Sequence, residues 1–229
     1  VKHRDITRAR REKNDVPVVA IVGYTNAGKS TLLNHLTDAE VLEEDKLFAT
    51  LDPTTRVLEL DGHQQILLTD TVGFIRKLPH HLIEAFKSTL EEAKYADYIF
   101  HVVDASNPQM DKQMHIVYET LDRLGVRNKK IVTLFNKMDQ RTDDEPLQDF
   151  RADHILMISA ARNEGLNEIK ELLQEMLRED KVYVERVVPY AQAGMIQLVR
   201  EKGELVSEEY VPEGIAIKAY VPMEVYGKL

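Results

Sequence analysis

Apolar residues occur along the chain as short continuous runs, separated by longer stretches in which they recur every three or four positions. The short runs are rich in β-branched residues and predict buried strands at residues 16–22, 98–103, 131–135 and 155–158. The longer stretches predict one helix that begins at Ser30 and amphipathic helices at about residues 80–95, 110–124 and 166–178. This alternation is typical of an α/β fold with a doubly wound, mostly parallel sheet.

The pattern changes in two places. Residues 38–55 show no periodicity, and the two runs that follow, 57–60 and 65–69, flank a short polar turn and predict a hairpin. Beyond Asp180, extended runs at 182–188, 204–210 and 214–221 surround a short helix at about 191–202. We therefore predict a main α/β domain at residues 16–180 and a small α+β domain at 181–229. The smaller domain is either a partner-binding surface or a lid on the sheet.

Composition narrows the class of protein. The chain has 229 residues, 43% of them hydrophobic and 30% charged, which is ordinary for a globular protein, and its formal net charge is −9. The absence of cysteine excludes disulfides and Cys-based zinc or redox chemistry. No apolar run is long enough to span a bilayer. We therefore expect a cytoplasmic protein without a membrane span.

The first 15 residues differ from the rest because they are rich in Lys and Arg. The chain begins with Val rather than Met, so we expect residues 1–15 to be a linker from a preceding domain. This stretch is either a solvated linker or an arm that contacts RNA phosphates. The acidity of the whole chain argues against a large nonspecific nucleic-acid surface, and DNA is not expected as a partner.

Residues 23–30 read GYTNAGKS, which fits the phosphate-loop pattern G-x-x-x-x-G-K-S between a predicted strand and a predicted helix. Backbone N–H groups of such a loop wrap phosphates, the lysine reaches the β- and γ-phosphates, and the serine hydroxyl ligates Mg²⁺. The predicted phosphate-binding residues are Gly23, Tyr24, Thr25, Asn26, Ala27, Gly28, Lys29, Ser30 and Thr31. The fold is therefore predicted to be that of a P-loop NTPase.

A second motif follows the third apolar run, where Asp70 and Gly73 form the pattern D-x-x-G. At the carboxyl end of a strand, Asp70 can hold Mg²⁺ through water, and the Gly73 N–H can bond the γ-phosphate. This short pattern alone is usually a turn. One hairpin after a phosphate loop, it predicts the sensor of the γ-phosphate.

A third motif, Asn136-Lys137-Met138-Asp139, closes the next strand but one. The Asp139 carboxylate can accept hydrogen bonds from guanine N1–H and N2–H₂, whereas adenine presents an acceptor at N1 and would be rejected. Asn136 is expected to brace the loop and bond the base edge, and the stem of Lys137 to pack over the ring. Ser159, Ala160 and Ala161 end the following strand and can offer backbone N–H groups to guanine O6. The order of motifs favours GTP over the ATP expected of an ATPase or a kinase.

The motifs together closely resemble the HflX family of GTPases, which is related to Obg and Era. The resemblance rests on GYTNAGKSTL at residues 23–32, FATLDPTTR at 48–56 and DTVGFIRKLPHHLIEAF at 70–86. It covers about residues 16–178, and residues 181–229 are more loosely similar to the C-terminal domain of bacterial HflX. The resemblance implies a monomeric GTPase that binds the large ribosomal subunit, contacts rRNA, and splits or rescues stalled ribosomes under stress.

The same resemblance suggests two ion ligands. The segment at 48–53 is similar to Obg and favours Thr50 as the residue that donates to Mg²⁺ beside Ser30 and Asp70, whereas a likeness to Era would favour Thr55, and Thr54 is adjacent. Lys29, Gly73 and Thr50 are then the predicted catalytic residues. Asn26 matches the position at which related GTPases hold K⁺, although its amide can equally stabilise the loop.

Phe74 follows the second motif, where many GTPases have a glutamine that orients the attacking water. We therefore expect slow intrinsic hydrolysis that a partner stimulates. Phe74 is either a core residue or a gate, and His80 and His81 are either substitutes for the glutamine or residues of an exposed helical turn. The alternative function is a GTP-dependent binding module with negligible turnover.

Overall fold

The computed structural model describes residues 16–37, 54–71, 73 and 92–229. Its main sheet has six strands in the order β2-β3-β1-β4-β5-β6. These strands are β1 (Val18–Gly23), β2 (Thr54–Glu59), β3 (Gln65–Asp70), β4 (Tyr98–Asp104), β5 (Lys130–Asn136) and β6 (His154–Met157). The pairings of β1 with β3 and β4, of β4 with β5 and of β5 with β6 are parallel. The α/β fold with a mostly parallel sheet is thus confirmed.

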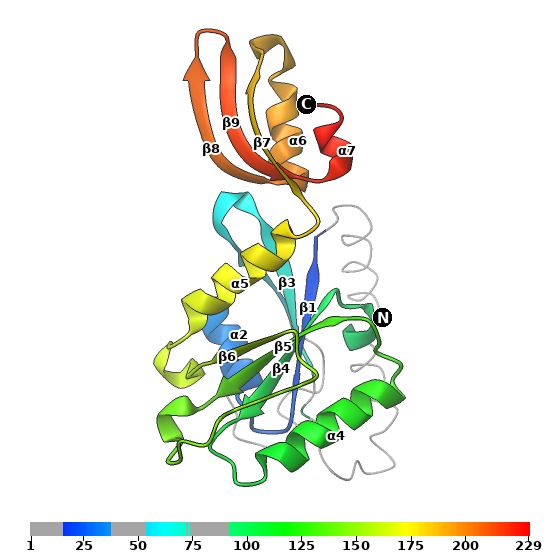
Figure 1. The fold of residues 1–229 in the computed structure, drawn as a ribbon, viewed down its shortest axis with the longest axis vertical. Helices are drawn as coiled ribbons and strands as arrows, with labels where there is room; N and C mark the ends of the chain where they lie inside the picture. The colour runs from blue at the N-terminus through cyan, green and yellow to red at the C-terminus, as the bar shows by residue number, and fades with distance from the viewer. Residues whose placement is uncertain (1–15, 38–53, 72, 74–91) are drawn as a thin grey trace. The chain divides into compact units, whose positions relative to one another are not determined.

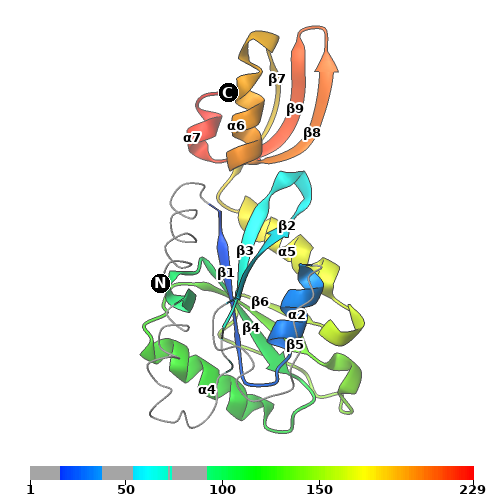
Figure 2. The ribbon, with the colours of Figure 1, turned by 180° about the vertical axis from the view of Figure 1, so that it is seen from behind.

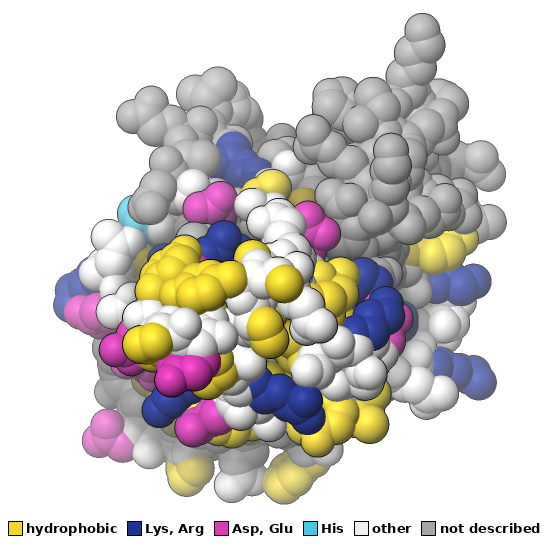
Figure 3. All heavy atoms as spheres, turned by 90° about the horizontal axis from the view of Figure 1, so that it is seen from above, with side chains coloured by type: hydrophobic (Ala, Val, Ile, Leu, Met, Phe, Trp, Pro, Cys, Tyr) yellow, Lys and Arg dark blue, Asp and Glu magenta, His cyan; other side chains and the backbone are white. Residues whose placement is uncertain are grey.

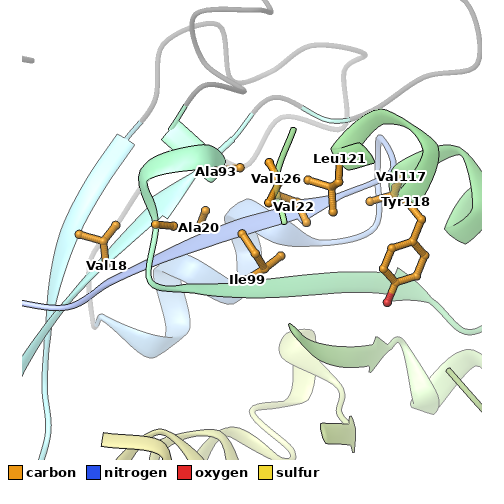
Figure 4. Close-up of a cluster of buried hydrophobic side chains, with 10 residues drawn as sticks. Val18, Ala20, Val22, Ala93, Ile99, Val117, Tyr118, Leu121 and Val126 are labelled. Carbon is orange, nitrogen blue, oxygen red and sulfur yellow. The ribbon is translucent and has the colours of Figure 1, made fainter. Parts of the chain in front are cut away.

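Helices cover both faces of this sheet. Figures 1 and 2 show α2 (Lys29–Leu36) on one face and α4 (Met110–Arg123) on the other. On the α4 side, alternate residues of β1 and Ile99 of β4 pack against Val117 and Leu121, and all of these are buried (Figure 4). Alternate residues of the strands thus pack against the apolar face of α4. Burial of this apolar surface stabilises the packing of α4 on the sheet.

The chain forms two compact units. One holds residues Pro17–Leu58 and Leu67–Ile169 and contains most of the six-stranded sheet. The described part of the other consists of Val16, Glu59–Ile66 and Lys170–Leu229, so it includes the tip of the β2–β3 hairpin and most of helix α5 (Leu166–Arg178). The predicted domain boundary at residue 180 stays a prediction.

The C-terminal residues form an antiparallel sheet in the order β7-β9-β8, built from β7 (Val182–Val188), β8 (Glu204–Val211) and β9 (Gly214–Val221). Helices α6 (Gly194–Lys202) and α7 (Met223–Tyr226) supply Ile196, Val199 and Val225 to the core of this sheet. Figure 3 shows Lys and Arg, Asp and Glu, and apolar side chains interspersed on the face it views. The described side chains in this view therefore carry both signs of charge.

Some details differ from the sequence prediction. The helix expected at 191–202 is interrupted, because a 3-10 turn at Tyr190–Gln192 precedes α6 and the two are separate elements. Short 3-10 turns also occupy Asp61–His63, Met138–Gln140 and Ala160–Arg162, which no periodicity signals. Most of the helix predicted at 80–95 lies outside the described residues. None of the described helices is long and apolar enough to cross a membrane.

A polar cluster is buried between α4 and the sheet. Asp149 accepts hydrogen bonds from Tyr118 Oη at 2.5 Å and from Thr133 Oγ1 at 2.6 Å. His101, which is 1% exposed, has its Nδ1 3.9 Å from the Asp149 carboxylate and meets the Tyr118 ring edge to face. Burial lowers the pKa of His101, so the imidazole is neutral at pH 7. Burial alone would raise the pKa of Asp149, but the nearby His101 and the hydrogen-bond donors Thr133 and Tyr118 lower it.

This cluster predicts that the protein loses stability in mild acid. The pKa of His101 is lower in the folded state, so the unfolded chain takes up its proton first, and stability falls as the pH drops below about 6.5. The free energy of unfolding should fall by up to about 1.4 kcal/mol for each pH unit, as measured by urea unfolding between pH 7 and 5. His101→Gln cannot take up this proton and should flatten the dependence. An equal slope in the variant would contradict this assignment.

Candidate functional site

The phosphate loop connects the carboxyl end of β1 to the first turn of α2. Gly23 pairs with Val102 of β4, and a Cβ at Gly23 would lie 2.3 Å from the Val102 carbonyl oxygen, so no side chain fits there. Gly28 has φ of 96° and caps α2 without any side-chain hydrogen bond to the first turn. The first N–H groups of the helix are therefore not satisfied by a capping side chain, and they are suited to bind an anion.

Lys29 and Ser30 follow directly at the start of α2. The Lys29 side chain is buried, and its Nζ donates to the Tyr24 carbonyl at 3.0 Å across the loop. Burial lowers the pKa of Lys29, and the negative charge of Asp70 opposes this effect. A phosphate group would give this buried ammonium a second anionic neighbour.

Asp70 ends β3, the neighbour of β1, and reaches the same place. It is 2% exposed, and its Oδ2 accepts a hydrogen bond from Ser30 Oγ at 2.8 Å. The parallel register that pairs Ile21 with Asp70 brings these two oxygen groups together although 40 positions separate them in the sequence. A hydroxyl and a carboxylate at one point are the ligand type that Mg²⁺ prefers.

Gly73 lies against the phosphate loop. A Cβ at Gly73 would come within 2.8 Å of Thr25 Cα and 3.1 Å of Lys29 Nζ. Because any side chain would collide with the backbone of Thr25, only glycine fits at this distance from the loop. The structure thus brings the predicted phosphate sensor to the predicted phosphate site.

Asn136, the last residue of β5, joins two loops. It is 2% exposed, its Nδ2 donates to the Ala27 carbonyl at 2.8 Å, and its Oδ1 accepts from the Ala160 N–H at 2.9 Å. A Cβ at Gly28 would lie 2.3 Å from the same Nδ2. The carboxamide therefore fixes the phosphate loop to the loop after β6, and the absence of a side chain at position 28 makes room for it.

The residues predicted to recognise the base follow in the same loop. Asp139 Oδ1 accepts a hydrogen bond from Ser159 Oγ at 2.6 Å, while Asp139 Oδ2 lies 3.5 Å from Arg162 Nε. Lys137 has φ of 63° and pairs with Asp104 at 2.7 Å. The serine hydroxyl orients the carboxylate, which is what discrimination of guanine requires of it.

The positions of the other predicted site residues say less about their roles. Tyr24 packs beside the core cluster under α4, Asn26 adopts φ of 62°, and Thr31 is half-buried. Thr55 Oγ1 hydrogen bonds Thr69 Oγ1 at 3.0 Å in the β2–β3 hairpin. Ala161 is exposed. The basic stretch 1–15 and four further residues lie outside the described residues: Thr50, Phe74, His80 and His81.

Two residues beside the site have no counterpart in the sequence analysis. Arg162 reaches Asp139 from the 3-10 turn at Ala160–Arg162, and Asp104 holds Lys137 from the end of β4. Arg162 gives no sequence signal, because an arginine one position after the Ser-Ala-Ala segment is unremarkable. Asp104 does have one, since an acidic residue directly after a buried strand lies at the edge of the sheet where the other site residues gather.

Phosphate loop, Asp70, Gly73 and the loop at 136–139 meet at the carboxyl ends of parallel strands, which is the arrangement of the P-loop class of guanine-nucleotide-binding proteins. The profile of the family described as "50S ribosome-binding GTPase" matches residues 18–137. The chain belongs to this family.

Relatives support a closer resemblance to HflX. The chain is 63% identical over 228 residues to a protein named GTPase HflX from Lacrimispora saccharolytica, covering all of this chain and 54% of that protein. It is 46% identical over 228 residues to the GTPase HflX of Caldanaerobacter subterraneus subsp. tengcongensis, again covering all of this chain and 52% of that protein. The resemblance to HflX is confirmed. The chain spans about half the length of these curated relatives.

A solved structure of a GTP-binding protein has a similar fold. A GTP-binding protein from the hyperthermophilic archaeon Sulfolobus solfataricus in complex with GDP superposes with a TM-score of 0.59 at 26% identity. The match covers 76% of this chain and 56% of that one. The likeness and the family together support a guanine nucleotide as the ligand of this site.

The position of Asn136 predicts a large effect of its removal. Asn136→Ala leaves the Ala27 carbonyl and the Ala160 N–H without their partner, which costs about 1–3 kcal/mol for each buried group. Urea unfolding without nucleotide should show the loss. Asn107→Ala removes a half-buried side chain whose Oδ1 accepts a solvent-exposed hydrogen bond from the Gln109 N–H, and it serves as the matched control. Equal stability of the two variants would show that the carboxamide does not hold the loops.

Proposed function

We propose that this chain binds GTP with Mg²⁺ and hydrolyses it to GDP and phosphate. The observation that carries the proposal is the buried Asn136 bridge, because it makes the phosphate-binding loop and the base-reading loop one continuous site. Neither loop alone is specific, since a phosphate loop serves many nucleotides and an Asp in a short loop occurs in many turns. Joined at this distance, the two loops can bind opposite ends of one guanine nucleotide.

The residues present fit Mg²⁺. Ser30 and Asp70 offer a hydroxyl and a carboxylate in direct contact, and Thr50 is the proposed third ligand. Nucleotide phosphates would complete the coordination of the ion. The ion would neutralise charge on the β- and γ-phosphates. Asn26 remains the proposed ligand for K⁺.

The protein's own groups then position the phosphates. Backbone N–H groups of the loop and of the first turn of α2 surround them, and Lys29 supplies a positive charge that is already desolvated. The Gly73 N–H is the proposed contact of the γ-phosphate, because that residue already lies beside Thr25 and Lys29. Water attacks the γ-phosphorus, the bond to the β-phosphate oxygen breaks, and the lost contact releases the segment around Gly73.

Recognition of the base follows from the carboxylate of Asp139. Ser159 occupies its Oδ1 while Oδ2 faces the more distant Arg162, so the carboxylate has capacity to accept from the guanine edge. The Ala160 N–H is already bonded to Asn136, and the exposed Ala161 is therefore the better candidate for guanine O6.

The proposed partner is the large ribosomal subunit. Support comes from the description of the family and from the similarity to proteins named HflX. By this resemblance we propose that the whole protein acts in the cytoplasm as a monomer and that it splits or rescues stalled ribosomes under stress. The proposed contact of the Gly73 N–H with the γ-phosphate exists with GTP and not with GDP, and this difference would set the affinity for the subunit.

The guanine assignment predicts a change of specificity in Asp139→Asn. An amide cannot accept both guanine donors but can donate to the 2-oxo group of xanthine, so the affinity for GTP should fall by about two orders of magnitude while xanthosine triphosphate becomes preferred. Asparagine keeps an oxygen for the Ser159 hydroxyl, which limits structural damage. Asp143→Asn, in the exposed loop that follows, is the control. Unchanged preference in Asp139→Asn would refute guanine recognition by this residue.

The ribosomal assignment predicts that purified large subunits accelerate GTP hydrolysis. Intrinsic turnover should be slow, and subunits should raise it by at least about tenfold, since a partner must supply groups that position the water. Multiple-turnover phosphate release with and without subunits measures this effect. Turnover that stays at background in both conditions would favour the GTP-dependent binding module instead.

A further inference from the structure

We propose that Asp104 is a positioning residue for the guanine nucleotide, acting through Lys137. The proposal rests on the proposed function and assigns a residue that the nucleotide motifs do not include. Asp104 is the last residue of β4, and the parallel register places it beside Asn136, the last residue of β5. It therefore stands at the same edge of the sheet as the base-reading loop.

Both oxygens of the Asp104 carboxylate are engaged. Oδ2 accepts from Lys137 Nζ at 2.7 Å. Oδ1 accepts from the Ser106 N–H at 3.1 Å and from the Ser106 hydroxyl at 2.6 Å. The carboxylate is thus oriented by Ser106 on one side, so that its other oxygen points at the ammonium. A backbone bond from the Ala105 N–H to the Asn136 carbonyl at 2.9 Å fixes the two strand ends to each other.

The pair is shielded from solvent more than most surface ion pairs. The Lys137 side chain is 20% exposed and that of Asp104 is 12% exposed. Exposed pairs contribute little, whereas a partly buried, charge-assisted hydrogen bond holds its partners in one geometry. The ammonium is therefore held at a fixed point, and the four-carbon stem of Lys137 is confined with it.

The backbone of Lys137 adopts a conformation that lysine rarely takes. Among the residues that the structure describes, four other than glycine have positive φ: Asn26, Asn128, Asn163 and Lys137. Asparagine tolerates this region well, but lysine does not. A strained backbone at a ligand site persists only where surrounding contacts enforce it, and the bond to Asp104 is such a contact.

The consequence for the nucleotide is twofold. The stem of Lys137, held at its end, forms a preorganised wall against which the base can pack, so less side-chain entropy is lost on binding. The ammonium is also kept away from Asp139, two positions further on, which would otherwise attract it and compete with guanine. Asp104 therefore supports both the packing and the polar recognition of the base without touching it.

The test compares GDP binding by the wild-type protein and Asp104→Asn, using a fluorescent GDP analogue and stopped-flow dissociation. We expect affinity to fall about tenfold, chiefly through faster dissociation. The hydrolysis rate at saturating GTP should stay unchanged, because the contact lies at the base and not at the γ-phosphate. Ser106→Ala loosens the carboxylate without removing its charge and should give a smaller loss in the same direction. Asp122→Asn breaks an ion pair with Arg151 at the far end of α4 and is the matched control.

A second variant separates positioning from simple structural damage. Lys137→Met keeps an apolar stem but lacks the ammonium, so Asp104→Asn should cause no further loss of affinity in this background. Additive losses in the double variant, or wild-type affinity in Asp104→Asn, would overturn the proposal. If the wild type binds tightly and Asp104→Asn binds equally tightly, only the positioning role of Asp104 fails and the proposed function stands. If the wild type itself fails to bind guanine nucleotide, the proposed function falls with it.

Discussion

The proposed nucleotide site depends on one buried side chain. Asn136 bonds the Ala27 carbonyl of the phosphate loop and the Ala160 N–H of the loop after β6. These two groups lie 109 and 24 positions from Asn136 in the chain. Buried polar groups must be satisfied, so the carboxamide and both loops form a single arrangement in which each part requires the others. Gly28 belongs to it as well, because any side chain there would occupy the space of Asn136 Nδ2.

The parallel sheet makes this arrangement possible. The strands β1, β3, β4 and β5 are far apart in sequence, but because they run parallel their carboxyl ends lie at one edge of the sheet. Ser30 with Asp70, and Lys137 with Asp104, are pairs of this kind. Each pair joins segments that lie at or after the ends of different strands, so the residues proposed for Mg²⁺ binding and for base recognition share one structural cause.

Much of this was accessible from sequence, for reasons that differ by residue. Lys29, Asp70 and Asp139 occur in motifs whose spacing reflects the strand-loop-helix geometry, and the strands were predicted because burial on both faces demands continuous apolar runs. The Lys137–Asp104 pair, the Asn136 bridge to Ala27 and the Asp149 cluster were not predicted. They depend on register and side-chain direction between distant segments, which no local pattern encodes.

The two polar clusters of the main sheet illustrate opposite uses of burial. Near the strand ends, Lys29 is buried before any phosphate binds. A phosphate that brings negative charge to this desolvated ammonium is therefore bound more strongly than it would be in water. Under α4, the Asp149 carboxylate already accepts hydrogen bonds from Tyr118 and Thr133. The first cluster is therefore suited to binding and the second to fixing α4 on the sheet, although their residue types alone would not distinguish them.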